Sequence, residues 1–402
     1  MVKEGSGIDL DLVVVGGGGR VGLPLALSFA SRGLSVGICD TDRARLQIIQ
    51  GGKMPFMEVG ADEALEQALS AGRLTFSDSP SILKRTSTII LIVGTPIDEF
   101  LNPSTQAFSR VVETIAPQLQ QDSLLILRST VFPGTTANVK ERLAVLGVRV
   151  EVVFCPERIA EGHALEEFQS LPQIIGSDSP EGLRRARMIF EPLGVEIVET
   201  SSKEAEVAKL MTNAWRYLKF AVANQFFEIA HAGGMDYNRI LEAIRYHYPR
   251  AADLPSPGLS AGPCLLKDTM QLAAYAADSF PVGHSAMMIN EGLPRYIVDA
   301  AARRYGLRGK TLGLLGMAFK GESDDPRDSL SYKIRKLAKF AGADVLASDP
   351  YIQDASFATL EEAMEKAELF IIAAPHALYA GLDFGQTPVI DIWGLTGQGI
   401  RL

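Results

Sequence analysis

A glycine-rich turn after a short apolar run near the N-terminus constrains the fold of this chain most. Positions 11–26 read D-L-V-V-V-G-G-G-G-R-V-G-L-P-L-A, so Gly17, Gly19 and Gly22 fit the pattern G-x-G-x-x-G between an expected strand and an expected helix. In such a turn the first glycine permits the sharp bend, the second lets a pyrophosphate approach the backbone, and the third lets helix and strand pack closely. The pattern predicts a dinucleotide site at the helix N-terminus. The alternative is a glycine-rich turn in an α/β fold that binds no dinucleotide.

An acidic residue at the end of the next apolar run indicates which dinucleotide this turn would bind. The run L-S-V-G-I-C-D ends in Asp40, about 20 residues beyond the glycines, where the acid that binds a ribose 2′-hydroxyl belongs. Its charge would repel a 2′-phosphate, so the sequence favours NAD over NADP. Arg43 and Arg45 follow closely and weaken that inference.

Three later apolar runs each end in residues suited to a ligand site. The runs at 88–96 and 124–136 end in small hydroxyl, Gly and Pro residues, which include Thr95, Ser129 and Thr130. Ligands of open parallel sheets lie beyond the carboxyl ends of the strands, so we expect these side chains at one crevice. The run at 148–162 carries Glu157 and Glu161, which would share one face if this segment were helical. The alternative for these two acids is an exposed acidic turn.

One long helix is predicted in the middle of the chain, because no Gly or Pro occurs between residues 195 and 232. The S-S-K-E sequence at 201–204 is typical of a helix N-terminus, so we expect a helix at 202–232 that is roughly 45 Å long. Lys209, Asn213 and Arg216 fall on one side of this mostly apolar helix. They form either a buried stripe that faces a ligand or a solvated edge in which Lys209 pairs with a nearby glutamate. A shorter helix is expected at 237–247, and a further helical stretch, broken by Gly292 and Pro294, at 284–305.

A cysteine in a loop rich in Gly and Pro is the clearest candidate for chemistry. Positions 257–268 read P-G-L-S-A-G-P-C-L-L-K-D, which places Cys264 just before Lys267 and Asp268. A neighbouring ammonium raises the thiolate fraction of a cysteine, and a carboxylate four residues on could hold a water or accept a proton. This is the outline of a covalent thiol site. A buried structural cysteine is the alternative.

The last third of the chain reads as a second, smaller α/β unit. A strand and a Gly-rich loop at 310–321, the sequence D-D-P-R-D-S at 324–329, a helix to about residue 341 and three further apolar runs follow in turn. Lys320 and Arg327 would meet phosphates at the strand ends, or they are surface charges paired with Asp324 or Asp325. We therefore predict an α/β fold with two doubly wound, Rossmann-like parallel sheets joined by the long central helix and an all-α dimerisation region. The expected domains are 1–200 for the NAD site, 201–305 for the helices and the cysteine loop, and 306–402 for the second sheet.

Composition narrows the function classes further. The net charge of −9 gives no general attraction to nucleic acid or to an anionic membrane surface. The three Cys form no C-x-x-C pair and the five His have no metal-ligand spacing, so we expect no metal and a reducing, cytoplasmic location. The N-terminus carries acids and only a short apolar run, and so predicts neither a signal peptide nor a membrane span.

In their order along the chain, these motifs resemble the UDP-glucose/GDP-mannose dehydrogenase family of NAD-dependent nucleotide-sugar 6-dehydrogenases. The resemblance covers nearly the whole chain. It rests on V-G-L-P-L-A, V-G-T-P, S-T-V-F-P-G-T-T, C-P-E-R-I-A-E-G, the K-x-x-x-N of Lys209 and Asn213, G-P-C-L-L-K-D and A-F-K-G-x-x-D-D-P-R.

The resemblance implies oxidation of C6 of a sugar nucleotide from alcohol to carboxylate with two NAD. Cys264 would attack the C6 aldehyde, and the thiohemiacetal would become a thioester that water hydrolyses. Lys209 would stabilise the developing oxyanion, and Asn213 and Asp268 would position the oxygen and a water. Glu157 would assist thioester hydrolysis, with Thr130 supporting the same water.

The resemblance also implies binding residues and a partner. The cofactor contacts it implies are Gly17, Gly19, Val21, Gly22, Asp40, Arg45, Thr95, Ser129, Thr130, Glu161 and Arg327. The implied substrate contacts are Glu157, Arg158, Lys209, Asn213, Arg216, Arg250, Gly258 and Lys320. Arg250 would come from a partner subunit, since the family commonly forms homodimers through the central helix.

The chain departs from the family pattern in places that bear on the substrate. Its cysteine loop has A-G-P-C where paired glycines are usual, C-L-L-K-D replaces C-L-P-K-D, and D-I-W at 391–393 replaces D-G-R. The sequence C-P-E-R in place of N-P-E-F is closer to the branch that acts on UDP-N-acetylmannosamine. We therefore expect that substrate ahead of UDP-glucose or UDP-N-acetylglucosamine. The competing hypotheses are a two-electron hydroxyacid-type dehydrogenase and a nucleotide-sugar sensor without turnover.

Overall fold

The structure is a computed structural model that describes residues 9–95, 98, 105–277, 279–397 and 402. It divides into two compact units, residues 1–211 and 212–402, each with a sheet of its own. Residues 1–8, which bear on the prediction about the N-terminus, lie outside the described residues. Within the part of the chain that the structure describes, no helix is both long and apolar enough to cross a membrane.

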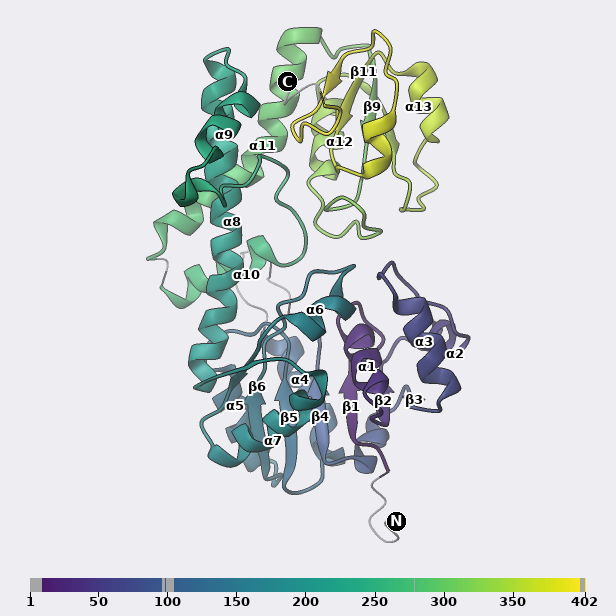
Figure 1. Cartoon of the computed structure of the whole chain (residues 1–402), viewed down its shortest axis with the longest axis vertical. Coiled ribbons are helices and arrows are strands. Elements are labelled where there is room, and N and C mark those ends of the chain that lie inside the picture. Colours follow the sequence, from purple (N-terminus) through teal and green to yellow (C-terminus); the bar gives the residue numbers. More distant parts are fainter. Residues whose placement is uncertain (1–8, 96–97, 99–104, 278, 398–401) are drawn as a thin grey trace. The chain divides into compact units, whose positions relative to one another are not determined.

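The first unit is built on an eight-stranded sheet in the order β3-β2-β1-β4-β5-β6-β7-β8 (Figure 1). Its strands pair in parallel, except for the antiparallel pair β6–β7. The order of strands reverses between β1 and β4, which is where such sheets bind ligands. The strand bounds are β1 Leu12–Val15, β2 Val36–Cys39, β3 Leu74–Ser77, β4 Thr88–Leu91, β5 Ser123–Leu127, β6 Val150–Phe154, β7 Gln173–Gly176 and β8 Ile197–Thr200.

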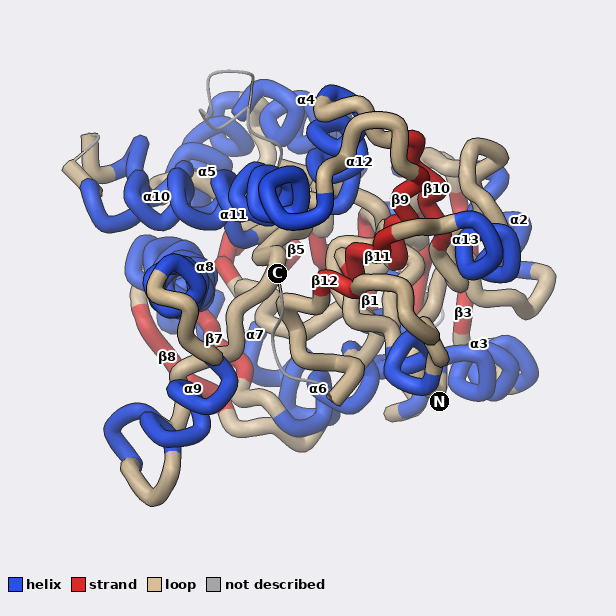
Figure 2. Tube along the Cα trace, turned by 90° about the horizontal axis from the view of Figure 1, so that it is seen from above, coloured by secondary structure: helices blue, strands red, loops and turns tan. Residues whose placement is uncertain are grey.

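Two apolar layers cover this sheet, which explains why its central strands are continuous apolar runs. One layer contains buried side chains of α1, α3, α6 and α7, and the other contains those of α4 and α5. Figure 2 shows strands lying between α3, α6 and α7 on one side and α4 and α5 on the other. The helix bounds are α1 Gly22–Ser31, α2 Arg43–Gln50, α3 Ala61–Ser70, α4 Thr105–Ile115, α5 Thr135–Val145, α6 Ala164–Ser170 and α7 Pro180–Phe190.

The long helix predicted in the middle of the chain is observed as α8, Ser202–Ala232. Its N-terminus has the reciprocal contacts of a capping box. The backbone N–H of Ser201 donates to Glu204 Oε2 at 3.0 Å, and the N–H of Glu204 donates to Ser201 Oγ at 3.3 Å. The predicted start of the helix was therefore correct for the expected reason.

The second unit contains helices α9 to α11 and a four-stranded parallel sheet in the order β10-β9-β11-β12. Helices α11 and α12 pack on one face of this sheet and α13 packs on the other. The bounds are α9 Tyr237–Arg245, α10 Leu265–Tyr275, α11 Pro281–Tyr305, β9 Thr311–Leu315, α12 Ser331–Phe340, β10 Asp344–Ser348, α13 Leu360–Lys366, β11 Leu369–Ile372 and β12 Val389–Ile390.

One secondary-structure prediction was wrong. Helix α11 continues through Gly292 and Pro294, where we expected a break. A proline inside a helix costs about 3 kcal/mol because it removes a backbone hydrogen bond and crowds the preceding turn. Leu293 and Ile297 are fully buried in the core beside it. Their burial on either side of Pro294 offsets this cost.

The predicted fold class is confirmed: the chain is an α/β protein with two parallel sheets and a long helical region between them in the sequence. The boundary between the two compact units falls within α8, after residue 211. The division into three domains at residues 200 and 305 stays a prediction.

Candidate active site

The glycine turn has the close packing that a dinucleotide site requires. A Cβ on Gly22 would lie 2.3 Å from the carbonyl oxygen of Gly16, so α1 can begin against the turn only with a glycine there. The residue with the left-handed backbone conformation is Gly16, at φ +78°, rather than Gly17. A Cβ on Gly19 would meet nothing closer than 3.5 Å, and Val21 directly precedes α1. The backbone is thus open at Gly19, where the pattern expects a pyrophosphate.

Asp40 lies against this turn, at the end of β2. Its Oδ2 accepts a hydrogen bond from the N–H of Gly18 at 3.0 Å, and its Oδ1 accepts one from the N–H of Asp42 at 3.0 Å. The two arginines that could have bound a 2′-phosphate are engaged with aspartates. Arg45 contacts Asp42 at 3.1 Å and Arg43 forms an ion pair with Asp78. The residues around the turn therefore fit NAD, as expected.

The hydroxyl residues that follow β4 and β5 contact the neighbouring strand end. Thr95 Oγ1 donates to the carbonyl oxygen of Thr130 at 2.6 Å. The backbone N–H of Val93 donates to Ser129 Oγ at 2.8 Å. These contacts link the segments that follow β4 and β5, two strands that are neighbours in the sheet.

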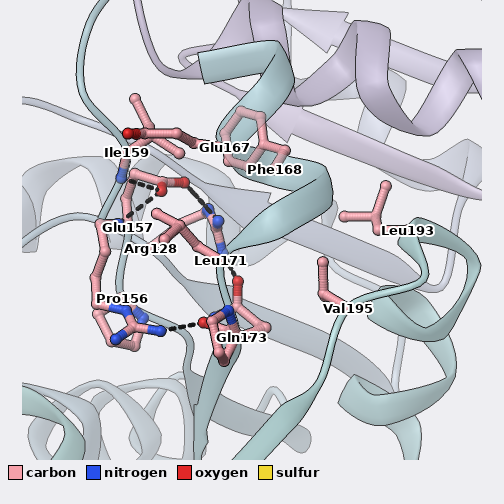
Figure 3. Close-up of a pocket in the computed structure, with 12 residues that line it drawn as sticks. Arg128, Pro156, Glu157, Ile159, Glu167, Phe168, Leu171, Gln173, Leu193 and Val195 are labelled. Carbon is pink, nitrogen blue, oxygen red and sulfur yellow. Dashed lines mark hydrogen bonds and ion pairs between the residues drawn. The ribbon is translucent and has the colours of Figure 1, made fainter. Parts of the chain in front are cut away.

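Glu157 is held in place by a buried arginine that the sequence reasoning did not single out (Figure 3). Arg128 is 3% exposed, and its Nε and Nη2 donate to Glu157 Oε2 at 2.7 and 2.5 Å. Glu157 Oε1 accepts the backbone N–H groups of Arg158 and Ile159 at 2.6 and 2.9 Å. The segment after β6 is not helical, so the condition under which Glu157 and Glu161 would share a helix face is not met.

Arg128 also anchors the neighbouring strands, which indicates a structural task. Its Nη1 donates to Gln173 Oε1 at 2.9 Å and to the carbonyl oxygen of Cys155 at 3.2 Å. Its guanidinium lies over the rings of Phe168 and Phe190, at 5.5 and 5.2 Å. The available signal was a single arginine at the end of an otherwise apolar strand, L-L-I-L-R-S-T.

Arg158 and Glu161 are the other two predicted site residues in the segment that follows β6. The Arg158 guanidinium donates to the carbonyl oxygen of Pro172, beside the small pocket shown in Figure 3. Glu161 is half-buried. Next to it, the N–H of Gly162 donates at 2.9 Å to Glu58, whose burial raises the pKa of its carboxyl group.

The polar stripe predicted on α8 is buried in part. Lys209 and Asn213 are buried, whereas Arg216 is exposed. Glu206, one turn before Lys209 on the helix, accepts hydrogen bonds from the N–H groups of Gly134 and Thr136 and so caps α5. The exposed position of Arg216 separates it from the other two members of the predicted stripe.

Cys264 is the exposed one of the three cysteines, all of which lie in the described residues. Burial raises the pKa of Cys39 to about 11 and that of Cys155 to about 12, so neither is a nucleophile at neutral pH. Cys264 directly precedes α10, and the N-terminus of a helix favours a negative charge.

A carboxylate one turn into α10 connects this helix to α8. Asp268 is fully buried, and its Oδ2 accepts a hydrogen bond from Asn213 Nδ2 at 2.6 Å. Its Oδ1 lies 2.6 Å from Lys267 Nζ. The structure therefore brings together Asn213 and Asp268, the two residues predicted to position the reacting oxygen and a water.

The cysteine loop packs against two segments that follow strand ends of the second sheet. A Cβ on Gly262 would lie 2.6 Å from the Phe319 ring, and a Cβ on Gly258 would lie 2.1 Å from the Trp393 ring. Lys320 follows Phe319 and is half-buried. Arg250 is exposed and stacks on Tyr248 at 5.7 Å.

The loop that carries Lys320 is fixed by a buried aspartate and a buried histidine. Asp349, after β10, accepts hydrogen bonds from the N–H groups of Met317 and Ala318 at 2.6 and 3.0 Å. It also lies 3.2 Å from His376 Nε2, and the N–H of Glu322 donates to His376 Nδ1 at 3.0 Å. The sequence reasoning did not single out Asp349 or His376 as residues that support this loop.

Arg327 is paired with Asp325, which is the alternative to a phosphate contact that the sequence left open. Its Nη2 and Nε bind the carboxylate of buried Asp325, at 2.5 and 2.9 Å. A contact between Arg327 and a phosphate would therefore involve a guanidinium that already has a carboxylate partner. Among the described residues, no group of three or more His, Cys, Asp or Glu side chains could hold a metal ion.

A doubly wound sheet whose glycine turn is backed by an acid that favours NAD defines the first unit as that of an NAD-dependent dehydrogenase. The second unit adds a four-stranded parallel sheet of its own to this dehydrogenase. The chain belongs to the UDP-glucose/GDP-mannose dehydrogenase family, as predicted. The family's NAD binding domain matches residues 11–194, its central domain residues 203–292 and its UDP binding domain residues 313–397. The chain is thus an NAD-dependent nucleotide-sugar 6-dehydrogenase.

The relatives are named for different sugars. The chain is 30% identical to UDP-N-acetyl-D-mannosamine dehydrogenase of Pyrococcus horikoshii, over 92% of this chain and 91% of that protein. It is 27% identical to the UDP-glucose 6-dehydrogenase TuaD of Bacillus subtilis, over 88% and 79%. Its structure is similar to a UDP-glucose dehydrogenase from Pyrobaculum islandicum, with a TM-score of 0.90, 27% identity and coverage of 100% and 99%. The family is therefore established, whereas these relatives leave the sugar open.

Proposed function

We propose that the chain oxidises C6 of UDP-N-acetyl-D-mannosamine to the uronate through a covalent bond to Cys264. One observation carries the mechanism: an exposed thiol directly precedes α10, and one turn further on Asp268 is hydrogen-bonded to Asn213. The UDP binding domain of the family matches the second sheet, which supports a UDP-sugar.

The proposed reaction assigns one task to each group. NAD, when bound, accepts a hydride in each of the two oxidations. After the first, Cys264 Sγ attacks the C6 aldehyde, and the carbonyl oxygen becomes the hydroxyl of a thiohemiacetal. Loss of a hydride from C6 and of the hydroxyl proton to solvent then leaves a thioester, and Lys209 stabilises the negative charge that develops on that oxygen.

Hydrolysis completes the reaction. A water positioned by Asp268 and Asn213 attacks the thioester, the C–S bond breaks, and the carboxylate leaves while Cys264 regains its proton. Thr130 supports this water, and Glu157 assists from the fixed position that Arg128 gives it. The remaining binding assignments made from the sequence, from Gly17 to Arg327, belong to the same proposal.

The order of substrates rests on the sequence C-P-E-R and on a relative. The Pyrococcus horikoshii protein, which is 30% identical, is named for UDP-N-acetyl-D-mannosamine. UDP-glucose is the second candidate, because the Pyrobaculum islandicum structure is named for it.

A panel of UDP- and GDP-sugars tests the proposal with purified protein. We expect two NADH and one uronate for each UDP-N-acetyl-D-mannosamine consumed. Turnover of UDP-glucose alone would overturn the order of substrates, and one NADH per sugar would support a two-electron dehydrogenase. Binding without NADH formation would favour a sensor.

Replacement of single cysteines tests the role of the thiol. We expect Cys264→Ala to abolish uronate formation, and iodoacetamide to label Cys264 and inactivate the wild type. Cys39→Ser is the matched control, because Cys39 is buried at the end of β2 and should leave turnover unchanged. Wild-type turnover by Cys264→Ala would contradict the covalent mechanism.

The proposal includes a homodimer formed through α8. Five large apolar side chains of this helix are exposed: Met211, Trp215, Val222, Phe226 and Ile229. At 100° per residue they fall within an arc of about 60°, so they form one stripe. A continuous exposed apolar stripe is typical of an interface, which supports association of two copies along this helix.

A further inference from the structure

A buried asparagine of α8 binds both backbone groups of Gly258, in the loop that leads to Cys264. The N–H of Gly258 donates to Asn224 Oδ1 at 2.8 Å, and Asn224 Nδ2 donates to the Gly258 carbonyl oxygen at 3.1 Å. Asn224 is fully buried. The Gly258 peptide groups are therefore paired by one side-chain amide, as they would be by a neighbouring strand.

A second asparagine fixes the orientation of this amide. Asn224 Nδ2 also donates to Asn290 Oδ1 at 2.9 Å, and Asn290 Nδ2 donates to the carbonyl oxygen of Tyr217 at 3.0 Å. If the Asn224 amide were flipped, its oxygen would face two other oxygens, those of Gly258 and Asn290. This hydrogen-bonded chain from α8 through α11 allows one arrangement of the loop.

Trp393 covers Gly258 where a side chain would otherwise project. A Cβ on Gly258 would lie 2.1 Å from Cζ3 of Trp393. The indole is itself held, because its Nε1 donates to the carbonyl oxygen of Ile372 at 3.1 Å. Trp393 stands in the D-I-W segment at 391–393, so the loop at Gly258 is covered by an aromatic ring.

The same loop is held again nearer the cysteine. The N–H of Gly262 donates to the carbonyl oxygen of Asp328 at 3.3 Å, and the Phe319 ring closes the space above its Cα. Gly258 and Gly262 are thus both held in place in the loop before Cys264. The side chain of Cys264 is exposed.

We propose that Asn224, oriented by Asn290, and Trp393 are positioning residues that fix the Gly258 peptide and thereby set where Cys264 presents its sulfur. This inference rests on the proposed role of Cys264 as nucleophile. It adds residues that touch neither the sugar nor the dinucleotide but act through the loop.

We call the two hydrogen bonds between the Asn224 amide and the backbone of Gly258 the amide clamp. Isosteric replacement of Asn224 tests it. Asn224→Asp keeps the acceptor for the Gly258 N–H but turns a carboxylate toward two carbonyl oxygens. We expect kcat to fall by about 100-fold, as small displacements of a reacting group do. The rate at which iodoacetamide labels Cys264 should change at least threefold without substrate, and the Kd for NAD should stay within twofold. Asn138→Asp, at an exposed position on α5, is the matched control and should change none of these.

A double-mutant cycle tests the aromatic contact independently and remains informative if Asn224→Asp does not fold. Gly258→Ala places a methyl group where the Trp393 ring lies, so we expect its kcat to fall about 100-fold. The double variant Gly258→Ala, Trp393→Ala should recover at least tenfold of that loss. A folded Asn224→Asp with wild-type kcat, or a cycle without coupling, would overturn the proposal.

The labelling rate separates this inference from the proposed function. If Cys264→Ala turned over at the wild-type rate, the covalent mechanism would fail. The clamp would still be supported by a changed labelling rate of Cys264 in Asn224→Asp. If Cys264 proved essential and the labelling rate did not change, the clamp would be wrong while the mechanism stood.

Discussion

Asn213 Nδ2 lies 2.6 Å from Asp268 Oδ2, and both side chains are buried. This hydrogen bond joins α8 to α10, one turn after Cys264. The second oxygen of Asp268 binds Lys267 Nζ at 2.6 Å. The carboxylate is thus oriented by an amide and an ammonium from two different positions, as a group that holds a water should be.

Replacement of Asp268 by asparagine should stall the reaction at the thioester. The amide of Asp268→Asn cannot accept a proton from the attacking water, so we expect kcat to fall on the order of 100-fold or more. Intact-protein mass spectrometry after addition of NAD and sugar nucleotide should show an adduct on Cys264. Asp299→Asn, at an exposed position on α11, is the control. Normal turnover without an adduct would remove Asp268 from hydrolysis.

Arg128 and Glu157 form a buried ion pair whose disruption should destabilise the first unit. Arg128→Met would leave the Glu157 carboxylate without its main partner, which should lower the free energy of unfolding by about 3–5 kcal/mol. Arg128→Lys should recover part of this loss, because an ammonium keeps the charge but not the two contacts of the guanidinium. Urea unfolding curves measure both values.

An exposed ion pair provides the comparison for this experiment. Arg142 lies 2.7 Å from Glu113, with both side chains about half exposed. Arg142→Met should change the free energy of unfolding by no more than about 1 kcal/mol. Equal losses for Arg128→Met and Arg142→Met would show that the buried pair does not hold the segment after β6.

Asp349 should make the stability of the second unit depend on pH in the acid range. Burial opposes its ionisation, but His376 and the N–H groups of Met317 and Tyr351 outweigh this effect and lower the pKa of the carboxyl group. Because the pKa is lower in the folded state, the stabilisation is complete above the unfolded value of 3.8 and is lost as the pH falls through the folded value.

Asp349→Asn should therefore destabilise the protein at pH 7, by about 3 kcal/mol, and progressively less below about pH 4. Melting temperatures of wild type and variant across this range give the comparison. Asp344→Asn, at an exposed position at the start of β10, should show no such dependence. A constant difference between wild type and Asp349→Asn at all pH values would contradict the assignment.

Local sequence signals were sufficient for most of the fold. The glycine turn, the apolar runs and the S-S-K-E cap each depend on residues close together in the chain, and the corresponding elements begin where they were expected. The exception was α11, because the burial of Leu293 and Ile297 in the core is a tertiary effect that a proline in the sequence does not reveal.

The candidate site was predictable where chemistry resides in one residue and not where it depends on a partner. Cys264 and Asp268 could be recognised by residue type within one motif. Arg128 binds a glutamate 29 residues away, and Asn224 binds a backbone 34 residues away. Neither pairing has a periodic signal, so these supports became visible only once the chain was folded.

The exposed stripe on α8 gives the most direct test of the proposed dimer. Trp215, Phe226 and Ile229 are 57%, 44% and 58% exposed, although each is large and apolar. The stripe extends over about 27 Å from Met211 to Ile229, since a helix rises 1.5 Å per residue. Ile229→Arg would place a charge in a desolvated interface, which costs several kcal/mol when the charge is unpaired.

We therefore expect Ile229→Arg to sediment as a monomer at concentrations where the wild type is a dimer. Met188→Arg is the matched control, because Met188 is 56% exposed on a different helix, α7, and should leave the dimer intact. Circular dichroism should show both variants folded, since an exposed position tolerates the arginine side chain. Because Arg250 is expected to reach a partner's substrate, the monomeric variant should also bind UDP-sugar more weakly. A wild-type protein that sediments as a monomer would refute the role of this helix face.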